Sequence, residues 1–157
     1  MILVTLGTQK EQFTRLLDYI EKSKIKDEII VQAGYTKFDS KKMKIFDFIS
    51  YDEMEEYINK CDVVITHAGT GSVLTPLKKG KKVIICPRLA KYHEHVDDHQ
   101  VELAEVFSEE GYVLELNEDN NLDDLMKKLK KFKPKEYVSN TDNFIEKLQK
   151  EIANYLK

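Results

Sequence analysis

The sequence has few of the features that mark secreted, membrane-spanning or nucleic-acid-binding proteins. Only two of its 157 residues are cysteines, and Cys61 and Cys86 both stand beside apolar runs, as buried free thiols do. Lysine and arginine number 25 against 28 aspartates and glutamates, so the net charge of −3 offers no broadly basic surface to nucleic acid. No stretch approaches the roughly 20 apolar residues that cross a bilayer. The short start MILVTLG, with no basic segment before it, does not suit a secretory signal. We therefore expect a cytoplasmic protein in a reducing compartment.

What the sequence does contain is an alternation of strand-like and helix-like segments. A chain of 157 residues that is 41% hydrophobic suits one domain with a real core. Short β-rich runs are found at 2–6, 28–33, 44–49, 62–66, 82–86 and 112–116. Helical spacing of apolar residues separates most of them, at 11–24, around 54–58, at 96–110 and at 122–132. This alternation predicts an α/β fold: a single Rossmann-like domain with a mostly parallel sheet over residues 1–133, followed by a linker and a C-terminal helix over 134–157.

Two glycine turns fall where predicted strands end, LGTQ after the first strand and HAGTGS after the fourth. In parallel α/β sheets ligands bind beyond the carboxyl ends of the strands. Gly69 and Gly71 permit close backbone approach, Ser72 is predicted to cap the next helix, and Pro76 to lie in its first turn. A helix N-terminus at this place favours an anion such as phosphate. An ordinary strand-to-helix turn explains the same residues about equally well. The turn is neither a dinucleotide fingerprint, which needs glycine at Leu74, nor a P-loop.

A second polar cluster, PRLAKYHEHVDDHQ, begins at the end of the fifth predicted strand and therefore faces the same edge of the sheet. Arg88 is placed to pair with a phosphate through two hydrogen bonds. His95 and His99 have the spacing of a metal-binding pair on a helix, but the H-E-x-x-H order is absent. We therefore predict no metal and no cofactor, and interpret the cluster as the polar rim of a sugar site.

In their order along the chain, these motifs resemble those of family 28 glycosyltransferases, specifically the donor-binding half. SYDEM, HAG-GS and PR…KY-EHVDDHQ follow one another between Phe48 and Gln100 as they do in that family. The family includes the peptidoglycan N-acetylglucosaminyltransferase and the catalytic subunit of the dolichol-pathway N-acetylglucosaminyltransferase. The resemblance is closer still to the small subunits of two-component bacterial capsule and exopolysaccharide glycosyltransferases.

The resemblance implies one half of a GT-B fold that works with a partner. The expected activity is inverting, metal-independent transfer of a hexose from a UDP-sugar donor. A separate membrane-anchored subunit would bind the acceptor, a lipid-diphosphate-linked saccharide, at the inner face of the cell membrane. This chain would be inactive without that subunit.

The resemblance also implies roles for individual residues. The backbone at Phe48 and Ile49 would hold the uracil, and Thr75 stands where the family usually places a glutamate on the ribose. The expected contacts to the rest of the donor come from Gly7, Thr8, His67, Gly69, Thr70, Gly71, Ser72, Arg88, His99 and Gln100. His67 and Arg88 would stabilise the leaving diphosphate. The general base is unassigned, with His67, Glu94 and His95 as catalytic candidates and the partner chain as another source.

Alternatives remain open at this stage. The same pocket would serve a non-catalytic sugar-nucleotide-binding regulatory subunit, and the pair His95 and His99 would serve a metal-dependent hydrolase. The lysine-rich stretch 126–135 suits either a solvated helix face or contact with anionic lipid. An apolar stripe from Phe144 to Leu156 predicts a last helix that packs either on the partner or on this domain's own sheet.

Overall fold

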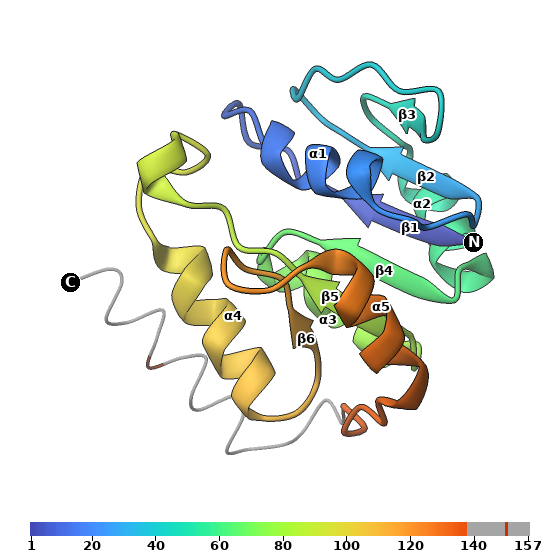
Figure 1. Cartoon of the computed structure of the whole chain (residues 1–157), viewed down its shortest axis with the longest axis vertical. Helices are drawn as coiled ribbons and strands as arrows, with labels where there is room; N and C mark the ends of the chain where they lie inside the picture. Colours follow the sequence, from blue (N-terminus) through green and yellow to red (C-terminus); the bar gives the residue numbers. More distant parts are fainter. Residues whose placement is uncertain (138–149, 151–157) are drawn as a thin grey trace.

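The computed structural model describes residues 1–137 and residue 150, and within them it contains a six-stranded, all-parallel sheet (Figure 1). The strand order is β3-β2-β1-β4-β5-β6. The strands are β1 (Ile2–Thr5), β2 (Ile29–Gln32), β3 (Lys44–Phe46), β4 (Val63–Thr66), β5 (Lys82–Ile85) and β6 (Leu114–Glu115). The helices are α1 (Thr14–Lys22), α2 (Tyr51–Lys60), α3 (Thr70–Lys78), α4 (His99–Glu109) and α5 (Leu122–Lys131), with one 3₁₀ turn at Ala90–Tyr92. The prediction of a Rossmann-like α/β domain with a parallel sheet is confirmed.

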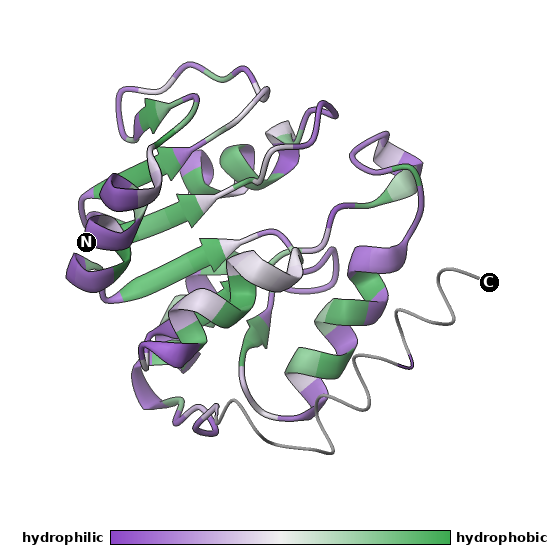
Figure 2. Ribbon diagram, turned by 180° about the vertical axis from the view of Figure 1, so that it is seen from behind, coloured by the Kyte–Doolittle hydropathy of each residue, from purple (hydrophilic) through white to green (hydrophobic). Residues whose placement is uncertain are grey.

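Helices cover both faces of the sheet, and each face has its own hydrophobic core. Successive strand residues point to opposite faces, so Val4 packs with α1 and α5 while Leu3 packs with α2, α3 and α4. The central strands are therefore apolar on both sides, which is why their sequences read as unbroken hydrophobic runs. Figure 2 shows these strands as a hydrophobic layer, with hydrophilic residues on the outer surfaces of the helices.

The face of the sheet on which the following helix packs changes between β1 and β4. These two strands are neighbours in the sheet although about 60 residues separate them in the chain. The helix after β1 packs on one face and the helix after β4 packs on the other. The loops that follow these two strands therefore diverge and leave a crevice at the carboxyl edge, the usual place for a ligand in open α/β sheets.

Two element boundaries differ from the sequence-based expectation. β3 ends at Phe46, so Phe48 and Ile49 lie in the loop that leads to α2 instead of in the strand. α4 begins at His99 and not near Val96; a 3₁₀ turn at Ala90–Tyr92 comes first, its C-cap His93 has a φ of 58°, and turns and bends occupy the residues up to 98. A non-glycine residue in that left-handed region interrupts helical continuation.

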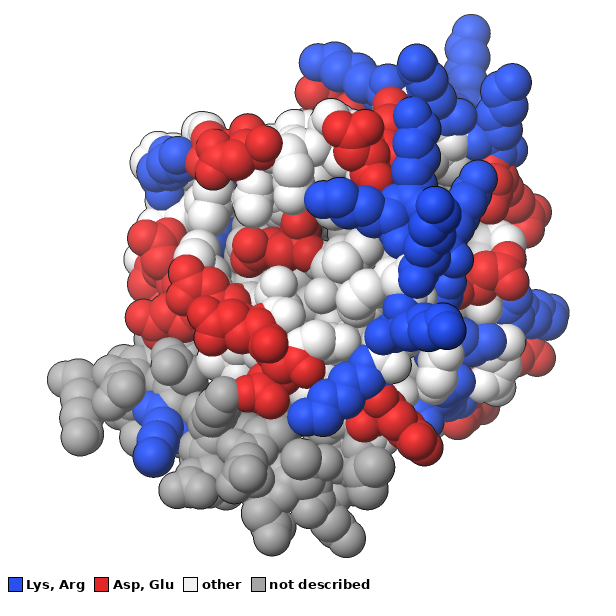
Figure 3. Space-filling model, turned by 60° about the horizontal axis from the view of Figure 1, so that its bottom comes forward, with Lys and Arg blue, Asp and Glu red and all other residues white. Residues whose placement is uncertain are grey.

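Three further expectations concern the periphery of the domain. Cys61 and Cys86 are buried free thiols, as predicted. No helix among the described residues is long and apolar enough to cross a membrane. Exposed lysines of α5 contribute to the lysine-rich right-hand side of the surface in Figure 3, the side on which α5 lies in Figure 1. Whether that surface contacts anionic lipid stays a prediction.

The chain leaves α5 at Lys131 and then runs alongside the end of α4. The Lys135 amide donates to the Gly111 carbonyl at 3.0 Å, and the rings of Tyr137 and Tyr112 meet edge to face at 5.7 Å between centroids. α5 ends at Lys131, close to the predicted end at residue 132, whereas the predicted helix from Phe144 lies outside the described residues.

Candidate functional site

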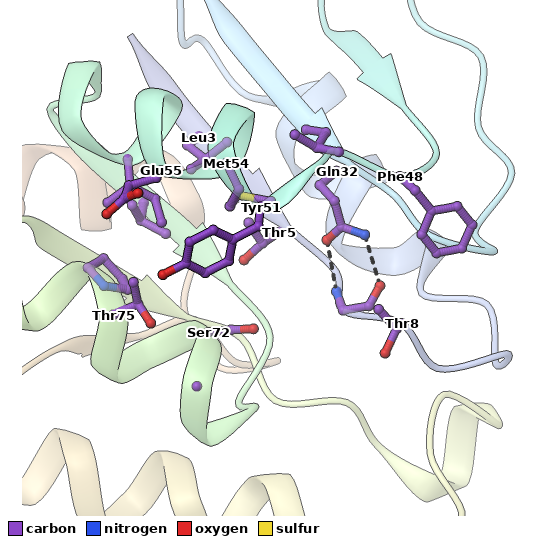
Figure 4. A pocket seen from close by; sticks show the side chains of 16 residues that line it. Leu3, Thr5, Thr8, Gln32, Phe48, Tyr51, Met54, Glu55, Ser72 and Thr75 are labelled. Carbon is purple, nitrogen blue, oxygen red and sulfur yellow. Dashed lines mark hydrogen bonds between the residues drawn. The ribbon is translucent and has the colours of Figure 1, made fainter.

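A pocket of about 440 Å³ opens between α2 and α3 at the carboxyl edge of the sheet (Figure 4). The ends of β1 and β2, the loops after β1 and β3, and the facing sides of the two helices contribute its walls. Its lining residues are Leu3, Thr5, Gly7, Thr8, Gln32, Phe48, Ile49, Tyr51, Met54, Glu55, Ile58, Val64, Gly71, Ser72, Thr75 and Pro76. The pocket has an apolar floor with hydroxyl and amide groups around it, the composition expected of a small-molecule site.

The structure brings seven of the residues predicted for the donor site to this one pocket. They come from three loops or helices that are far apart in the sequence: Gly7, Thr8, Phe48, Ile49, Gly71, Ser72 and Thr75. Sequence reasoning missed the polar and aromatic members of α2 and β2, namely Gln32, Tyr51 and Glu55. Tyr51 is 81% exposed and its ring lies across the pocket in Figure 4. An aromatic residue directly after Ser50, a residue type that suits a helix N-cap, was a signal for Tyr51; Gln32, inside an apolar strand, gave none.

The first turn of α3 forms one wall and differs from the prediction in two details. The N-cap is Gly69, with a φ of −81° and a ψ of 133°, and no side chain caps the helix. Ser72 therefore lies inside the first turn and not at the cap, and Pro76 lies beyond the first turn. An α-helix leaves its first N–H groups without partners in the helix. Gly71 and Ser72, which line the pocket, thus present N–H groups and a partial positive charge to it.

The two glycines of this turn have different physical roles. A Cβ at Gly69 would come within 2.5 Å of Cε1 of His67, so the protein's own packing requires glycine there. A Cβ at Gly71 would meet no heavy atom within 4 Å. Gly71 therefore leaves open space beside the helix N-terminus, on the side of the pocket.

The loop after β1 is held in place by a glutamine of β2. Gly7 has a φ of 83°, a conformation that favours glycine. The Gln32 amide nitrogen donates to the Gly7 carbonyl at 3.0 Å, and its oxygen accepts from the Gly7 amide at 3.2 Å (Figure 4). Because both backbone groups of Gly7 are paired, the loop that carries Thr8 has a defined position at the edge of the pocket.

His67 lies behind the pocket wall and not in the pocket. It is 5% exposed, and its ring lies between Gly7 and Gly69. Burial, with a further contribution from the charge of Arg88, lowers the pKa of His67 from 6.5 to about 4. The ring is therefore neutral near pH 7. His67 does not line the pocket, and its Nε2 lies 3.2 Å from the hydroxyl of Ser72, which does; a direct contact of His67 with the diphosphate stays a prediction.

Arg88 is a structural residue and not a phosphate ligand. Its side chain is 0% exposed. One terminal nitrogen donates to the carbonyls of Glu11 and Glu94, at 2.8 and 2.9 Å, and the other to the carbonyl of Leu6 at 2.6 Å. Burial lowers the pKa of Arg88 to about 10, which is still well above neutral pH. The guanidinium therefore stays charged, and its hydrogen bonds go to backbone oxygens. The predicted phosphate contact is therefore wrong.

Gln100 and Glu94 are also committed to the interior. Gln100 is 3% exposed, and its oxygen accepts from the amides of Ala68 at 3.1 Å and Arg88 at 3.0 Å. Glu94 is 3% exposed and forms an ion pair with Arg15 at 2.9 Å. Neither side chain lines the pocket, and both are engaged inside the domain, so the structure gives no support to the predicted donor contact of Gln100 or the predicted base role of Glu94.

The remaining predicted residues, Thr70, His95 and His99, do not line the pocket. Nδ1 of His95 lies 3.1 Å from a carboxylate oxygen of Asp97, and His99 begins α4. Within residues 1–137 no group of three or more histidine, cysteine, aspartate or glutamate side chains is arranged to hold a metal ion. A role for these three residues at the rim stays a prediction.

Comparison with known proteins gives this geometry a family. Residues 1–155 match the glycosyltransferase family 28 C-terminal domain. The chain belongs to this family. Among curated proteins, the UDP-N-acetylglucosamine transferase subunit ALG13 of Candida glabrata is 35% identical over 108 residues, which are 68% of this chain and 51% of that protein. The human ALG13 subunit is 39% identical over 62 residues, 40% of this chain and 5% of that protein. The match to this chain thus covers about half of the length of the Candida glabrata relative and a small part of the human one.

Solved structures support the fold assignment. A solution structure of ALG13 has a TM-score of 0.59 at 23% identity and covers 91% of this chain and 92% of its own. MurG of Acinetobacter baumannii has a TM-score of 0.50 at 17% identity and covers 82% of this chain but only 40% of its own. The match of residues 1–155 to the family model confirms the family 28 resemblance. The curated relatives are subunits of a UDP-N-acetylglucosamine transferase, so they do not support the finer prediction of a capsule or exopolysaccharide enzyme.

Proposed function

We propose that this family 28 domain is the donor-binding subunit of a UDP-sugar-dependent glycosyltransferase whose acceptor is held by a second polypeptide. The observation that carries the proposal is the pocket between α2 and α3. It joins the loop at Phe48 and Ile49, the N-terminus of α3 at Gly71 and Ser72, and Thr75 in one cavity of about 440 Å³, large enough for a nucleotide.

The pocket suits a nucleoside diphosphate because its polar and apolar parts are separate. The loop after β3 would hold the base through its backbone, with the exposed ring of Tyr51 beside it. The diphosphate would lie at the N-terminus of α3, where N–H groups and the helix dipole oppose its charge. The same groups would stabilise the negative charge that develops on the diphosphate as the sugar leaves, with no need for a metal.

The described residues that line the pocket offer few candidates for a general base that could act on the acceptor hydroxyl. Glu55 is the only carboxylate among the described residues that line the pocket, and its Oε1 lies 3.4 Å from Nζ of Lys79. Glu94 is buried in an ion pair. A base supplied from a second chain accounts for this shortage, and the ALG13 relatives are themselves named as subunits.

The finer parts of the proposal come from the motif resemblance. They are an inverting reaction, a lipid-diphosphate-linked saccharide as acceptor, and a place at the cytoplasmic membrane face through the partner. The sequence does not distinguish glucose, galactose and N-acetylglucosamine as the transferred sugar, and the names of the ALG13 relatives favour N-acetylglucosamine.

A thermal-shift panel of nucleotides tests the donor class. A ligand that binds only the native state raises its stability by RT ln(1 + [L]/Kd), or about 2.7 kcal/mol at 100 times Kd. We expect UDP and UDP-sugars to raise the melting temperature, and GDP- and CDP-sugars to leave it unchanged. Equal shifts with all three bases, or none with UDP, would contradict the proposal.

Turnover tests the subunit role. Candidate membrane subunits would be co-expressed with this chain and assayed with radiolabelled UDP-glucose, UDP-galactose and UDP-N-acetylglucosamine on lipid-linked saccharides. We expect transfer only when both chains are present, and loss of transfer in Gly71→Val, whose side chain would fill the diphosphate position. UDP binding without turnover in any such pair would instead favour a regulatory subunit.

A further inference from the structure

The protein contains a directed chain of side-chain hydrogen bonds that ends at the pocket. It runs from Gln100 in α4, through His67 after β4, to Ser72 in α3. Nε2 of Gln100 lies 3.0 Å from Nδ1 of His67, and Nε2 of His67 lies 3.2 Å from Oγ of Ser72. The first two residues are buried, and the third lines the pocket (Figure 4).

The direction of the chain follows from its buried end. The Gln100 oxygen accepts two backbone hydrogen bonds, from Ala68 at 3.1 Å and from Arg88 at 3.0 Å. The other terminal atom of the Gln100 amide must therefore be the NH₂ group, which can only donate. Nδ1 of His67 accepts that hydrogen bond, so it carries no hydrogen.

The histidine transmits this direction to the pocket. A neutral imidazole carries one hydrogen, and with Nδ1 as acceptor that hydrogen is on Nε2. Nε2 then donates to Ser72 Oγ. Because the oxygen of Ser72 has received a hydrogen bond, its own O–H is left to donate, and no other partner of this hydroxyl is found among the described residues. The hydroxyl therefore presents a hydrogen to the pocket, beside the N–H groups of the first turn of α3.

We propose that Gln100 and His67 are positioning residues that orient the Ser72 hydroxyl as a hydrogen-bond donor to the diphosphate of the bound nucleotide. The proposal rests on the function proposed above. It gives His67 and Gln100 a role at the site although neither lines the pocket. It also explains why the tautomer of a neutral histidine matters here: a hydrogen on Nε2 leaves the Ser72 O–H to an anion, whereas the tautomer with its hydrogen on Nδ1 would accept that O–H.

The tautomer of His67 is a direct test on the free protein. Long-range ¹H–¹⁵N correlation spectra distinguish a histidine protonated at Nε2 from one protonated at Nδ1. We expect His67 to be protonated at Nε2 alone at neutral pH. Protonation at Nδ1 would overturn the proposal whether or not the protein binds UDP.

The role of the hydroxyl is tested by comparing UDP with uridine. Ser72→Ala is expected to weaken UDP binding by roughly 10- to 100-fold, the usual range for a hydrogen bond to a charged group, and uridine binding by less than about twofold. The matched control is Thr75→Ala, one turn along the same helix and lining the same pocket. Thr75→Ala should change the two affinities by the same factor. Equal losses for UDP and uridine in Ser72→Ala would overturn the proposal.

Gln100→Glu tests the positioning role itself. The carboxylate keeps acceptors for the amides of Ala68 and Arg88 but can no longer donate to His67. Nδ1 of His67 should then be protonated. If the His67 ring of this variant is neutral, with its one hydrogen on Nδ1, UDP affinity should fall by the same factor as in Ser72→Ala. If the ring is charged, with hydrogens on both nitrogens, UDP affinity should be retained.

The affinity is therefore expected to follow the hydrogen on Nε2, with the melting temperature measured alongside. Loss of affinity in a folded Gln100→Glu protein that keeps this hydrogen would overturn the proposal, and so would full affinity without it. A wild-type protein that binds uridine but not UDP would also overturn it. A protein that binds no uridine compound would contradict the proposed function, and Ser72 would then have no diphosphate to bind. The tautomer measurement would still test the hydrogen bonds from Gln100 through His67 to Ser72.

Discussion

Gly69 caps α3 and Gly71 lies within its first turn. Replacing each of them with alanine is expected to change the stability of the protein in opposite directions. In Gly71→Ala the new methyl group meets no heavy atom within 4 Å, and the residue is in a helix. Replacing glycine by alanine there removes backbone entropy from the unfolded state. We expect the free energy of unfolding to rise by up to about 0.5–1 kcal/mol.

In Gly69→Ala the methyl group comes within 2.5 Å of the His67 ring. The ring has little freedom to move away, because it also packs closely against Gly7 and is held by hydrogen bonds to Gln100 and Ser72. Overpacking of this kind costs roughly 1–3 kcal/mol. For a chain of this size each kcal/mol shifts the melting temperature by about 2–4 °C. The two variants should therefore melt on opposite sides of the wild-type protein.

The same pair separates folding from binding. Gly71→Ala places its methyl group in the open space beside the helix N-terminus, where the diphosphate is proposed to lie, so UDP affinity should fall in a protein that is at least as stable as the wild type. Calorimetry for UDP and thermal melting would be measured for both variants. A destabilised Gly71→Ala protein, or one that binds UDP with unchanged affinity, would refute the reasoning.

Three further predictions follow from other parts of the structure. Glu94→Gln leaves the partly buried, charged Arg15 without its ion-pair partner and should cost roughly 1–3 kcal/mol of stability, while the folded protein still binds UDP; loss of turnover at unchanged stability would instead restore Glu94 as a base. Since the pKa of His67 falls from 6.5 to about 4 on folding, the unfolded chain binds the extra proton between these values, so stability should decrease by up to roughly 3 kcal/mol as pH falls from 6.5 to 4. Urea unfolding across that range would show this dependence, and His67→Gln should flatten it; an equal dependence in His67→Gln would assign it to other groups. Truncation after Ser139 removes the predicted last helix and should leave a folded, UDP-binding domain that no longer captures its membrane subunit in a pull-down, whereas an unfolded product would place that helix in the core of this domain.

The sequence by itself determined the class of fold and the edge at which ligands bind. The runs VVI in β4 and VII in β5 are apolar at every position, a pattern typical of strands covered on both faces. Their alternation with amphipathic helices gives parallel connections, which bring the strand ends, and hence Gly7 and Gly71, to a common edge. Local patterns of this kind are visible in one dimension because they depend on neighbours within a few residues.

Only the tertiary structure decided which polar residues face the ligand and which hold the fold. Arg88, Gln100 and Glu94 stand in the same polar segment as exposed residues, and nothing in their spacing shows that they point inward. Their partners, such as the carbonyl of Leu6 for Arg88 and the amide of Ala68 for Gln100, are 82 and 32 residues away in the chain. The direction of a side chain at a loop is set by such distant partners, and so the residues that looked most suited to bind phosphate and sugar turned out to stabilise the interior, while Tyr51 and Gln32 took places at the pocket.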